Sequence, residues 1–134
     1  MSEHKEQRLR RGMRWLYLKV GTTVYRRVDV YVRDLETLPC RELGPEFKVR
    51  LLAEHELPAY QAMRPGRSRS EALSRWAAED ACMVVWHGSR IVHCAWIATK
   101  QVFIPYLERE LVLLPATIYV YDMYTLPDYR GRGI

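Results

Sequence analysis

The residues best suited to chemistry lie in the last stretch of the chain, where an aromatic segment runs into a glycine-spaced turn. Residues 117–125 are rich in β-branched and aromatic side chains, which is typical of a strand, and Pro127 ends the run. Residues 130–133 then read Arg-Gly-Arg-Gly, and glycine lets backbone approach a ligand without obstruction. The N–H groups of such a turn can converge on an anion, particularly where a helix begins next. The stretch therefore predicts an anion-binding turn after a strand.

The composition places this stretch in a single globular domain. The chain has 134 residues, of which 49% are apolar and 28% are charged, and this balance argues against disorder. A chain of this length can bury one hydrophobic core. The net charge of +5 belongs to residues 1–50, with twelve Lys and Arg against seven Asp and Glu, whereas residues 51–134 carry nine of each. The part with the predicted site is therefore neutral as a whole.

Membrane, export and metal signals are weak. No apolar run approaches the ~20 residues of a membrane-spanning helix, and residues 15–18 are too few and too closely flanked by charge for a signal peptide. Cys40, Cys82 and Cys94 are odd in number and lack CxxC spacing, which argues against a disulfide framework or a zinc site. We therefore expect a cytoplasmic protein without a metal.

Residues 1–45 form an extension before the main domain. Residues 1–20 place an apolar stripe and an arginine stripe on separate faces, which predicts a basic amphipathic helix. An isolated helix of about 15 residues is marginal in water, so this one must pack on its own domain, on a partner or on an anionic surface. Residues 24–34 alternate as a strand with one polar face, and residues 35–45 are a linker with two prolines.

Residues 46–134 predict a sheet with two helices inserted after its first strand. The first helix ends before Pro65, because the residue preceding a proline is disfavoured in the helical region. Ser68 and Glu71 fit a capping box at the start of the second helix. The Arg-rich loop at residues 64–69 could meet an anionic substrate, although a solvated loop between helices is the commoner explanation.

A hairpin follows the helices. Residues 82–86 and 91–99 predict strands joined by His87-Gly88-Ser89-Arg90, whose central Gly-Ser suits a type II′ turn. Both faces of the second strand are apolar, so we expect it to be central and covered on both sides. His93 on that strand is expected to be a hydrogen-bonded group rather than a ligand. Residues 101–115 contain two prolines and have no clear periodicity.

The order of these elements and the final motif resemble the GNAT superfamily of acyl-CoA-dependent N-acyltransferases. That family's signature is Arg or Gln, two residues, Gly, one residue, then Gly or Ala. Here Arg130, Gly133 and the spacer Ile134 fit, and the last position would be residue 135. The resemblance covers residues 46–134 as the N-terminal part of the domain. It implies an α+β fold, a mostly antiparallel mixed sheet flanked by helices, whose C-terminal part lies beyond the chain, which we therefore expect to be catalytically poor.

The resemblance also implies a reaction, most simply acetyl transfer from acetyl-CoA, or another acyl-CoA, to a primary amine. In such proteins the pantetheine arm pairs with the strand before the turn, and the pyrophosphate binds the turn. Backbone of that strand can also polarise the thioester carbonyl, and one such donor is worth on the order of 3 kcal/mol. The acyl-CoA contacts expected on this basis are Met123, Tyr124, Thr125, Arg130, Gly131, Arg132, Gly133 and Ile134.

Attack by a neutral amine requires a base. Asp122 is the first candidate, because a carboxylate can accept the ammonium proton near neutral pH, and Tyr121 and Tyr119 follow, since tyrosine has a pKa of about 10. Pairing of Asp122 with a nearby arginine, or capping of a bulge, has equal weight. His93 and His87 come next, and no acid for the thiolate can be nominated.

Two other interpretations compete with an acyltransferase. Gly131-x-Gly133 could begin a dinucleotide-binding fingerprint, but Pro127 and the hairpin before it do not suit the parallel crossover which that fold needs. Alternatively, the chain is a non-catalytic binding module whose basic N-terminus meets anionic lipid or nucleic acid. For the enzyme we expect no specific nucleic acid contact, a possible homodimer, and at most a weak membrane-surface contact by the N-terminal helix.

Overall fold

The computed structural model describes residues 33–39, 42–105 and 107–134. The helix predicted for residues 1–20, most of the strand predicted for residues 24–34, and Cys40 lie outside these ranges. The described residues divide into two units. The smaller contains residues 33–38, 104–105 and 107–109, and the larger contains residue 39 together with 42–103 and 110–134.

The smaller unit includes one short turn of helix. In η1 (Leu35–Thr37), the side chain of Asp34 accepts a hydrogen bond from the N–H of Glu36 at 3.0 Å, which satisfies one free donor at the start of the turn. Leu38 is already extended, so the turn does not continue. Every residue with a predicted catalytic or cofactor-binding role lies in the larger unit.

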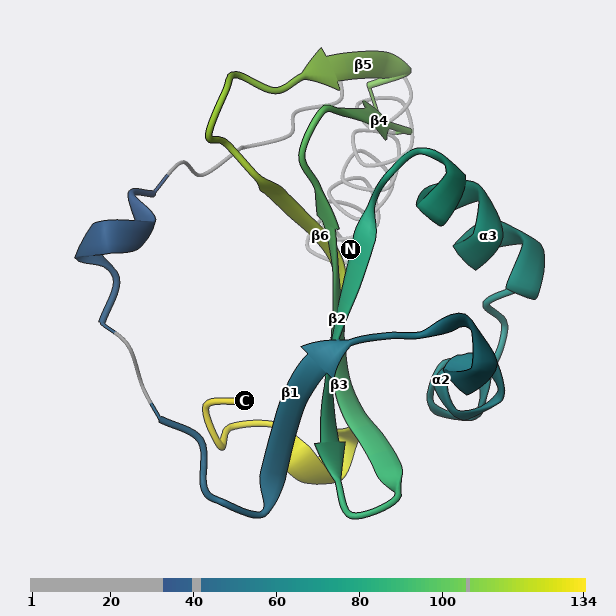
Figure 1. Cartoon of the computed structure of the whole chain (residues 1–134), viewed down its shortest axis with the longest axis vertical. Helices are drawn as coiled ribbons and strands as arrows, with labels where there is room; N and C mark the ends of the chain where they lie inside the picture. Colours follow the sequence, from purple (N-terminus) through teal and green to yellow (C-terminus); the bar gives the residue numbers. More distant parts are fainter. Residues whose placement is uncertain (1–32, 40–41, 106) are drawn as a thin grey trace, which may run out of the picture. The chain divides into compact units, whose positions relative to one another are not determined.

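The larger unit is built on a four-stranded antiparallel sheet (Figure 1). Its strand order is β1-β2-β3-β6, which places β3 between two partners, as predicted. The predicted α+β class with a mostly antiparallel sheet is confirmed. The segment left without periodicity supplies β4 (Gln101–Ile104) and β5 (Arg109–Val112), which pair in a separate two-stranded sheet. The strands of the main sheet are β1 (Phe47–Leu51), β2 (Ala81–His87), β3 (Arg90–Ala98) and β6 (Tyr119–Thr125).

The β2–β3 hairpin forms as its turn residues predict. Gly88 has a φ of 58°, whereas Ser89 is not in the positive-φ region, which is the pattern of a type II′ turn. The register of the hairpin shifts opposite Val85 and Trp86, because Val92 of β3 is an extra residue there. A Gly88 replacement would meet no nearby atom, so backbone conformation alone demands glycine here.

Two helices pack on the same side of the sheet (Figure 1). After a short turn, η2 (Glu54–Glu56), α2 (Leu57–Met63) begins with Pro58 in its first turn and ends before Pro65, as predicted. α3 (Arg69–Ala77) starts at Ser68, whose Oγ accepts from the N–H of Glu71 at 3.1 Å. Only this half of the predicted capping box forms, because Glu71 turns its own carboxylate to two arginines. Within the described ranges, no helix has the length and apolar content to cross a membrane.

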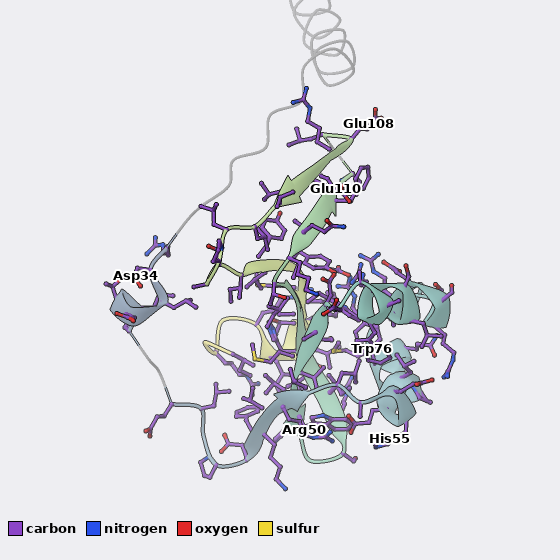
Figure 2. All side chains as sticks on the ribbon, turned by 45° about the horizontal axis from the view of Figure 1, so that its top comes forward. Asp34, Arg50, His55, Trp76, Glu108 and Glu110 are labelled. Carbon is purple, nitrogen blue, oxygen red and sulfur yellow. The ribbon has the colours of Figure 1, made fainter. Side chains whose placement is uncertain are left out.

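The core between helices and sheet is centred on Trp96 of β3. Its indole is fully buried, and its Nε1–H donates to the hydroxyl of Tyr60 on α2 at 3.0 Å. The rings of Tyr60 and Trp76 lie 6.3 and 6.1 Å from that of Trp96, within the range of favourable aromatic contacts. Trp76 lies at the boundary between α3 and the sheet (Figure 2). The helices are therefore fixed against β3 by aromatic packing and one buried hydrogen bond.

A second anchor joins the end of β1 to the start of α2. The guanidinium of Arg50 donates to both carboxylate oxygens of Glu56, which is only 8% exposed, and the N–H of Ala53 donates to the same carboxylate at 3.0 Å. These hydrogen bonds, with that from Arg50 first, hold the pKa of Glu56 below its usual value despite burial. The pair fixes the direction in which the chain leaves the sheet to form the helices.

Candidate functional site

Strand β6 is interrupted by a bulge at residues assigned to the predicted site. Asp122 and Met123 together lie opposite a single residue of β3, Ala95, because the register shifts there. Asp122 has a φ of 49°, in the left-handed region that few non-glycine residues adopt. Met123 is 63% exposed. The bulge takes backbone out of the regular ladder on a strand at the end of the sheet order.

Three arginines converge on the carboxylate of Asp122. Arg64 and Arg67 donate to Oδ1 at 2.6 and 2.8 Å, and Arg75 donates to Oδ2 at 2.8 Å. Glu71 connects two of them, accepting from Arg67 at 2.8 Å and from Arg75 at 2.6 Å. The side chains of Asp122, Arg64 and Arg75 are only 11%, 13% and 16% exposed. Asp122, Arg64 and Arg75 are therefore largely withdrawn from water, where charge-assisted hydrogen bonds are strongest, whereas Arg67 and Glu71 are 36% and 34% exposed.

This network corrects the interpretation of the Arg-rich loop. The sequence favoured a solvated loop, with an anionic substrate as the alternative. Instead, Arg64 and Arg67 pair with strand β6, and Arg69 forms an exposed ion pair with Glu54 at 2.6 Å. The partner of the first two arginines is supplied by the aromatic strand, 55 and 58 residues further along the chain.

Two of these arginines, Arg64 and Arg75, also cover aromatic rings on either side of the bulge. The guanidinium of Arg75 lies 5.1 Å from the ring centre of Tyr121 and 4.8 Å from that of Trp96. The guanidinium of Arg64 lies 4.5 Å from the ring centre of Tyr124. Cation–π contacts of this kind are most favourable when they are partly desolvated. Each arginine therefore holds both the carboxylate of Asp122 and the ring next to the bulge.

The three residues predicted as candidate bases are brought together on β6, but their contacts differ. Both oxygens of Asp122 accept hydrogen bonds from arginine, so the ion-paired alternative has direct support and the base role stays a prediction. Tyr121 donates its hydroxyl to Asp80 at 2.5 Å, and burial, reinforced by this bond, raises its pKa well above the ordinary value. Tyr119 stacks on Tyr121 with ring centres 6.1 Å apart.

His93 is paired with the end of β6. Its Nδ1 lies 2.8 Å from the hydroxyl of Thr125, so the expected hydrogen-bonded role is confirmed. Burial lowers its pKa, which favours the neutral imidazole at neutral pH. A neutral imidazole can accept a proton. His87, the other histidine considered, instead places its Nδ1 2.8 Å from the hydroxyl of Tyr129.

The turn after β6 begins with a buried anchor. Leu126 is 7% exposed and its N–H donates to the carbonyl of Val92 at 2.9 Å, after which η3 (Pro127–Tyr129) turns the chain. Arg130 bends back, and its Nε–H donates to the carbonyl of Thr125 at 3.0 Å. Its guanidinium also lies 5.7 Å from the ring centre of Tyr124. One arginine of the predicted anion-binding motif is thus oriented by the strand itself.

The remainder of the turn keeps its backbone donors available. Gly131 and Gly133 have φ values of 72° and 76°, which explains glycine at both positions. Among the described residues, none accepts a hydrogen bond from the N–H groups of residues 131–134. Arg132 lies over the ring of Tyr129, 5.1 Å from its centre. The turn therefore presents N–H groups that are unpaired within the described part of the chain, beside two guanidiniums.

Aromatic contacts hold this turn against the start of β1 and the end of β2. Besides its hydrogen bond with His87, Tyr129 packs edge-on against Phe47, with ring centres 6.4 Å apart. Phe47 in turn lies 5.2 Å from the His87 ring. Sequence reasoning missed this cluster, because its three members come from separate elements and none has a local signal.

Other reactive groups in the described residues are not placed for catalysis. Cys82 and Cys94 are fully buried, and burial raises their pKa values to about 12 and about 11, so both thiols stay protonated. In the described ranges, no three His, Cys, Asp or Glu side chains come together to hold a metal ion. The bulge on β6 and the turn after it are the strongest candidate site.

Comparison with known proteins adds one similarity. No family model and no curated protein matches the chain. Among solved structures, the chain is similar to the crystal structure of an acetyltransferase from Trypanosoma brucei, with 24% sequence identity and a TM-score of 0.46. The match covers 65% of this chain and 65% of that one. A similarity of this extent does not by itself assign an activity to the chain.

Proposed function

We propose that the chain belongs to an acyl-CoA-dependent N-acyltransferase that transfers an acyl group, most simply acetyl, to a primary amine. The observation that carries the proposal is the continuous path formed by β6, its bulge and the turn of residues 126–134. A strand with released backbone, followed directly by a turn of unpaired N–H groups, matches the two ends of an acyl-CoA. The resemblance of residues 130–134 to the GNAT signature supports the same assignment.

The bulge would serve the thioester end. Backbone at Met123, Tyr124 and Thr125 would pair with the pantetheine arm, and a backbone N–H at the bulge would donate to the thioester carbonyl. A donor already fixed at the position of the developing negative charge lowers the barrier without reorganisation. Removing one such donor typically costs roughly 100- to 1,000-fold in kcat.

The turn would serve the pyrophosphate end. Two left-handed glycines, Gly131 and Gly133, turn successive N–H groups outward without a Cβ in the way, and Ile134 continues the same run. Arg130 and Arg132 add positive charge, and both rest on aromatic rings that restrict their rotamers. Restricting an arginine before binding reduces the entropy lost when the ligand arrives.

The contacts favour His93 as the group that accepts the proton from the amine. Asp122 has both oxygens engaged, and the Tyr121 hydroxyl donates to Asp80, whereas the partly buried His93 imidazole has a lowered pKa. Its partner Thr125 belongs to the strand proposed to bind pantetheine. The pH profile of acyl transfer tests His93 against the other candidate bases, Asp122, Tyr121 and Tyr119. If only His93→Gln loses the acidic limb of that profile, His93 is the base.

Binding is tested first, by titration calorimetry of the 134-residue chain with acetyl-CoA. We expect saturable binding that Arg130→Gln and Arg132→Gln each weaken by about 10- to 100-fold, as a charge-assisted hydrogen bond is worth about 1.5–3 kcal/mol. Arg69→Gln is the matched control, because Arg69 pairs with Glu54 in solvent. Transfer is then measured as release of free CoA thiol with a panel of primary amines. An absence of acetyl-CoA binding would refute the proposed function.

A further inference from the structure

We propose that Arg64, Arg67 and Arg75 clamp Asp122 in order to hold the β6 bulge in shape, so that Asp122 is a positioning residue for the acyl thioester. We call these four residues the arginine clamp. The inference rests on the proposed function and deepens it, because it says what presents the bulge backbone to the thioester. It assigns no proton transfer to Asp122.

The backbone at Asp122 needs such a support. A φ of 49° is unfavourable for a residue with a Cβ, and backbone of this kind persists only where its surroundings over-determine it. Three hydrogen bonds of 2.6–2.8 Å from Arg64, Arg67 and Arg75 provide that determination. The strained residue and the convergence of three guanidiniums therefore coincide at one position of the strand.

The clamp also fixes the bulge from both sides. Arg75 comes from α3 and covers Tyr121, which precedes the bulge, whereas Arg64 comes from the loop after α2 and covers Tyr124, which follows it. The two arginines take different oxygens of Asp122. Rotation of the bulge would thus break hydrogen bonds and ring contacts together, so the released backbone is held relative to α2 and α3.

The charges argue against proton acceptance by Asp122. Within the network, three guanidiniums face the two carboxylates of Asp122 and Glu71. Neutralising Asp122 would leave Arg64 and Arg75, which are 13% and 16% exposed, without their main partner in a poorly hydrated place. Removing one partner of a buried ion pair is strongly unfavourable, and turnover would require it in every cycle.

Arginine substitutions separate the two roles of Asp122. If Asp122 were the base, Arg75→Gln would leave its carboxylate in place and one oxygen less engaged, so turnover would persist. If Asp122 positions the bulge, Arg75→Gln and Asp122→Asn should damage the same step. The double variant should then lose little more than either single variant, because both act through one structure.

The experiment measures kcat and KM for acetyl-CoA, with the pH profile, in Asp122→Asn, Arg75→Gln and the double variant. We expect kcat to fall roughly 10- to 100-fold in all three variants, which is less than the fall in kcat that follows complete removal of an oxyanion donor. The pH profile should be unchanged, and KM should stay within about threefold of the wild-type value. Arg69→Gln should behave as wild type, because its ion pair lies in solvent away from the bulge. If a variant fails to fold, Asp122→Glu and Arg75→Lys replace it.

A second measurement does not depend on activity. Amide hydrogen exchange at Tyr121 and Tyr124, the residues paired with β3 on either side of the bulge, should accelerate by about tenfold or more in Asp122→Asn and Arg75→Gln but not in Arg69→Gln, because loss of the clamp loosens the bulge. Normal kcat in Arg75→Gln together with an inactive Asp122→Asn would overturn the inference. A wild-type chain that does not bind acetyl-CoA would refute the proposed function instead, and unchanged exchange in the clamp variants would refute the clamp on its own.

Discussion

Removing the hydroxyl group of Tyr60 tests how Trp96, the ring on which Arg75 lies, is held in the core. The Tyr60 hydroxyl, on α2, accepts a hydrogen bond of 3.0 Å from Nε1 of Trp96 on β3. Both side chains are buried, with 2% and 0% exposure, so water cannot replace the lost partner in Tyr60→Phe. The Trp96 ring is also the surface on which Arg75 lies, 4.8 Å from its centre. The substitution keeps the aromatic ring and removes only the acceptor.

Two opposing terms set the expected change in the free energy of unfolding. A buried donor left without a partner costs about 1–3 kcal/mol. Against this, the Tyr60 side chain is only 2% exposed, so deleting its hydroxyl recovers part of the cost of desolvating it. We therefore expect Tyr60→Phe to destabilise the fold by about 1.5 kcal/mol. In a Trp96→Phe background there is no indole N–H to strand, so the same substitution should be nearly neutral.

The measurement is equilibrium unfolding in urea, followed by tryptophan fluorescence, for both single variants and the double variant. Tyr119→Phe is the control, because the Tyr119 hydroxyl bonds to none of the described residues and its loss should cost under about 0.5 kcal/mol. Equal stability of Tyr60→Phe and wild type, at an unchanged slope with urea, would show that the indole N–H does not depend on Tyr60. An equal cost in both backgrounds would refute the pairing as the cause.

Three further substitutions test the site and its supports. Arg75→Lys keeps the charge but loses the planar, forked contacts and the stacking, and we expect a loss of about 1–2 kcal/mol in urea unfolding, against no change for Arg69→Lys. Burial lowers the pKa of His93 in the folded chain, so the unfolded chain binds the proton more readily. The free energy of unfolding should therefore fall as pH drops below about 6.5 and level off once pH is below the lowered pKa. His93→Gln should remove this dependence from unfolding curves measured at a series of pH values. Ser68→Ala removes the cap of α3 and should cost about 1 kcal/mol by thermal unfolding, with Ser68→Gly closer to wild type.

The features that sequence predicted correctly are those decided by a few neighbouring residues. Gly88 adopts the positive φ that its hairpin turn requires, Pro65 limits α2, and Pro127 ends the aromatic strand. The central place of β3 follows from apolar residues on both its faces, which no edge strand could bury. In each case the conformation that the local residues prefer is the one that the tertiary fold requires, so a short window of sequence is enough to predict it.

The arginine clamp could not be predicted in the same way, because its members are brought together by packing. Arg64 and Asp122 are 58 residues apart, and which strand the loop after α2 faces depends on how Trp96 and Tyr60 pair the helix with β3. The sequence gives ion pairing of Asp122 with an arginine equal weight with a catalytic role, and the structure supports the ion pair. The sequence does not indicate which of its arginines pairs with Asp122.

The bulge, by contrast, has a sequence signal in the spacing of the tyrosines on β6. Tyr119 and Tyr121 alternate as strand residues should, but the next ring is Tyr124, three positions on rather than two. Tyr121 and Tyr124 nevertheless both receive an arginine from the helical part of the chain, Arg75 on α3 and Arg64 just after α2, so an extra residue must be accommodated between them. That extra residue directs Asp122 to the arginines and also releases the neighbouring backbone. In this chain the change of period between Tyr121 and Tyr124, with Asp122 between them, therefore marks the bulge.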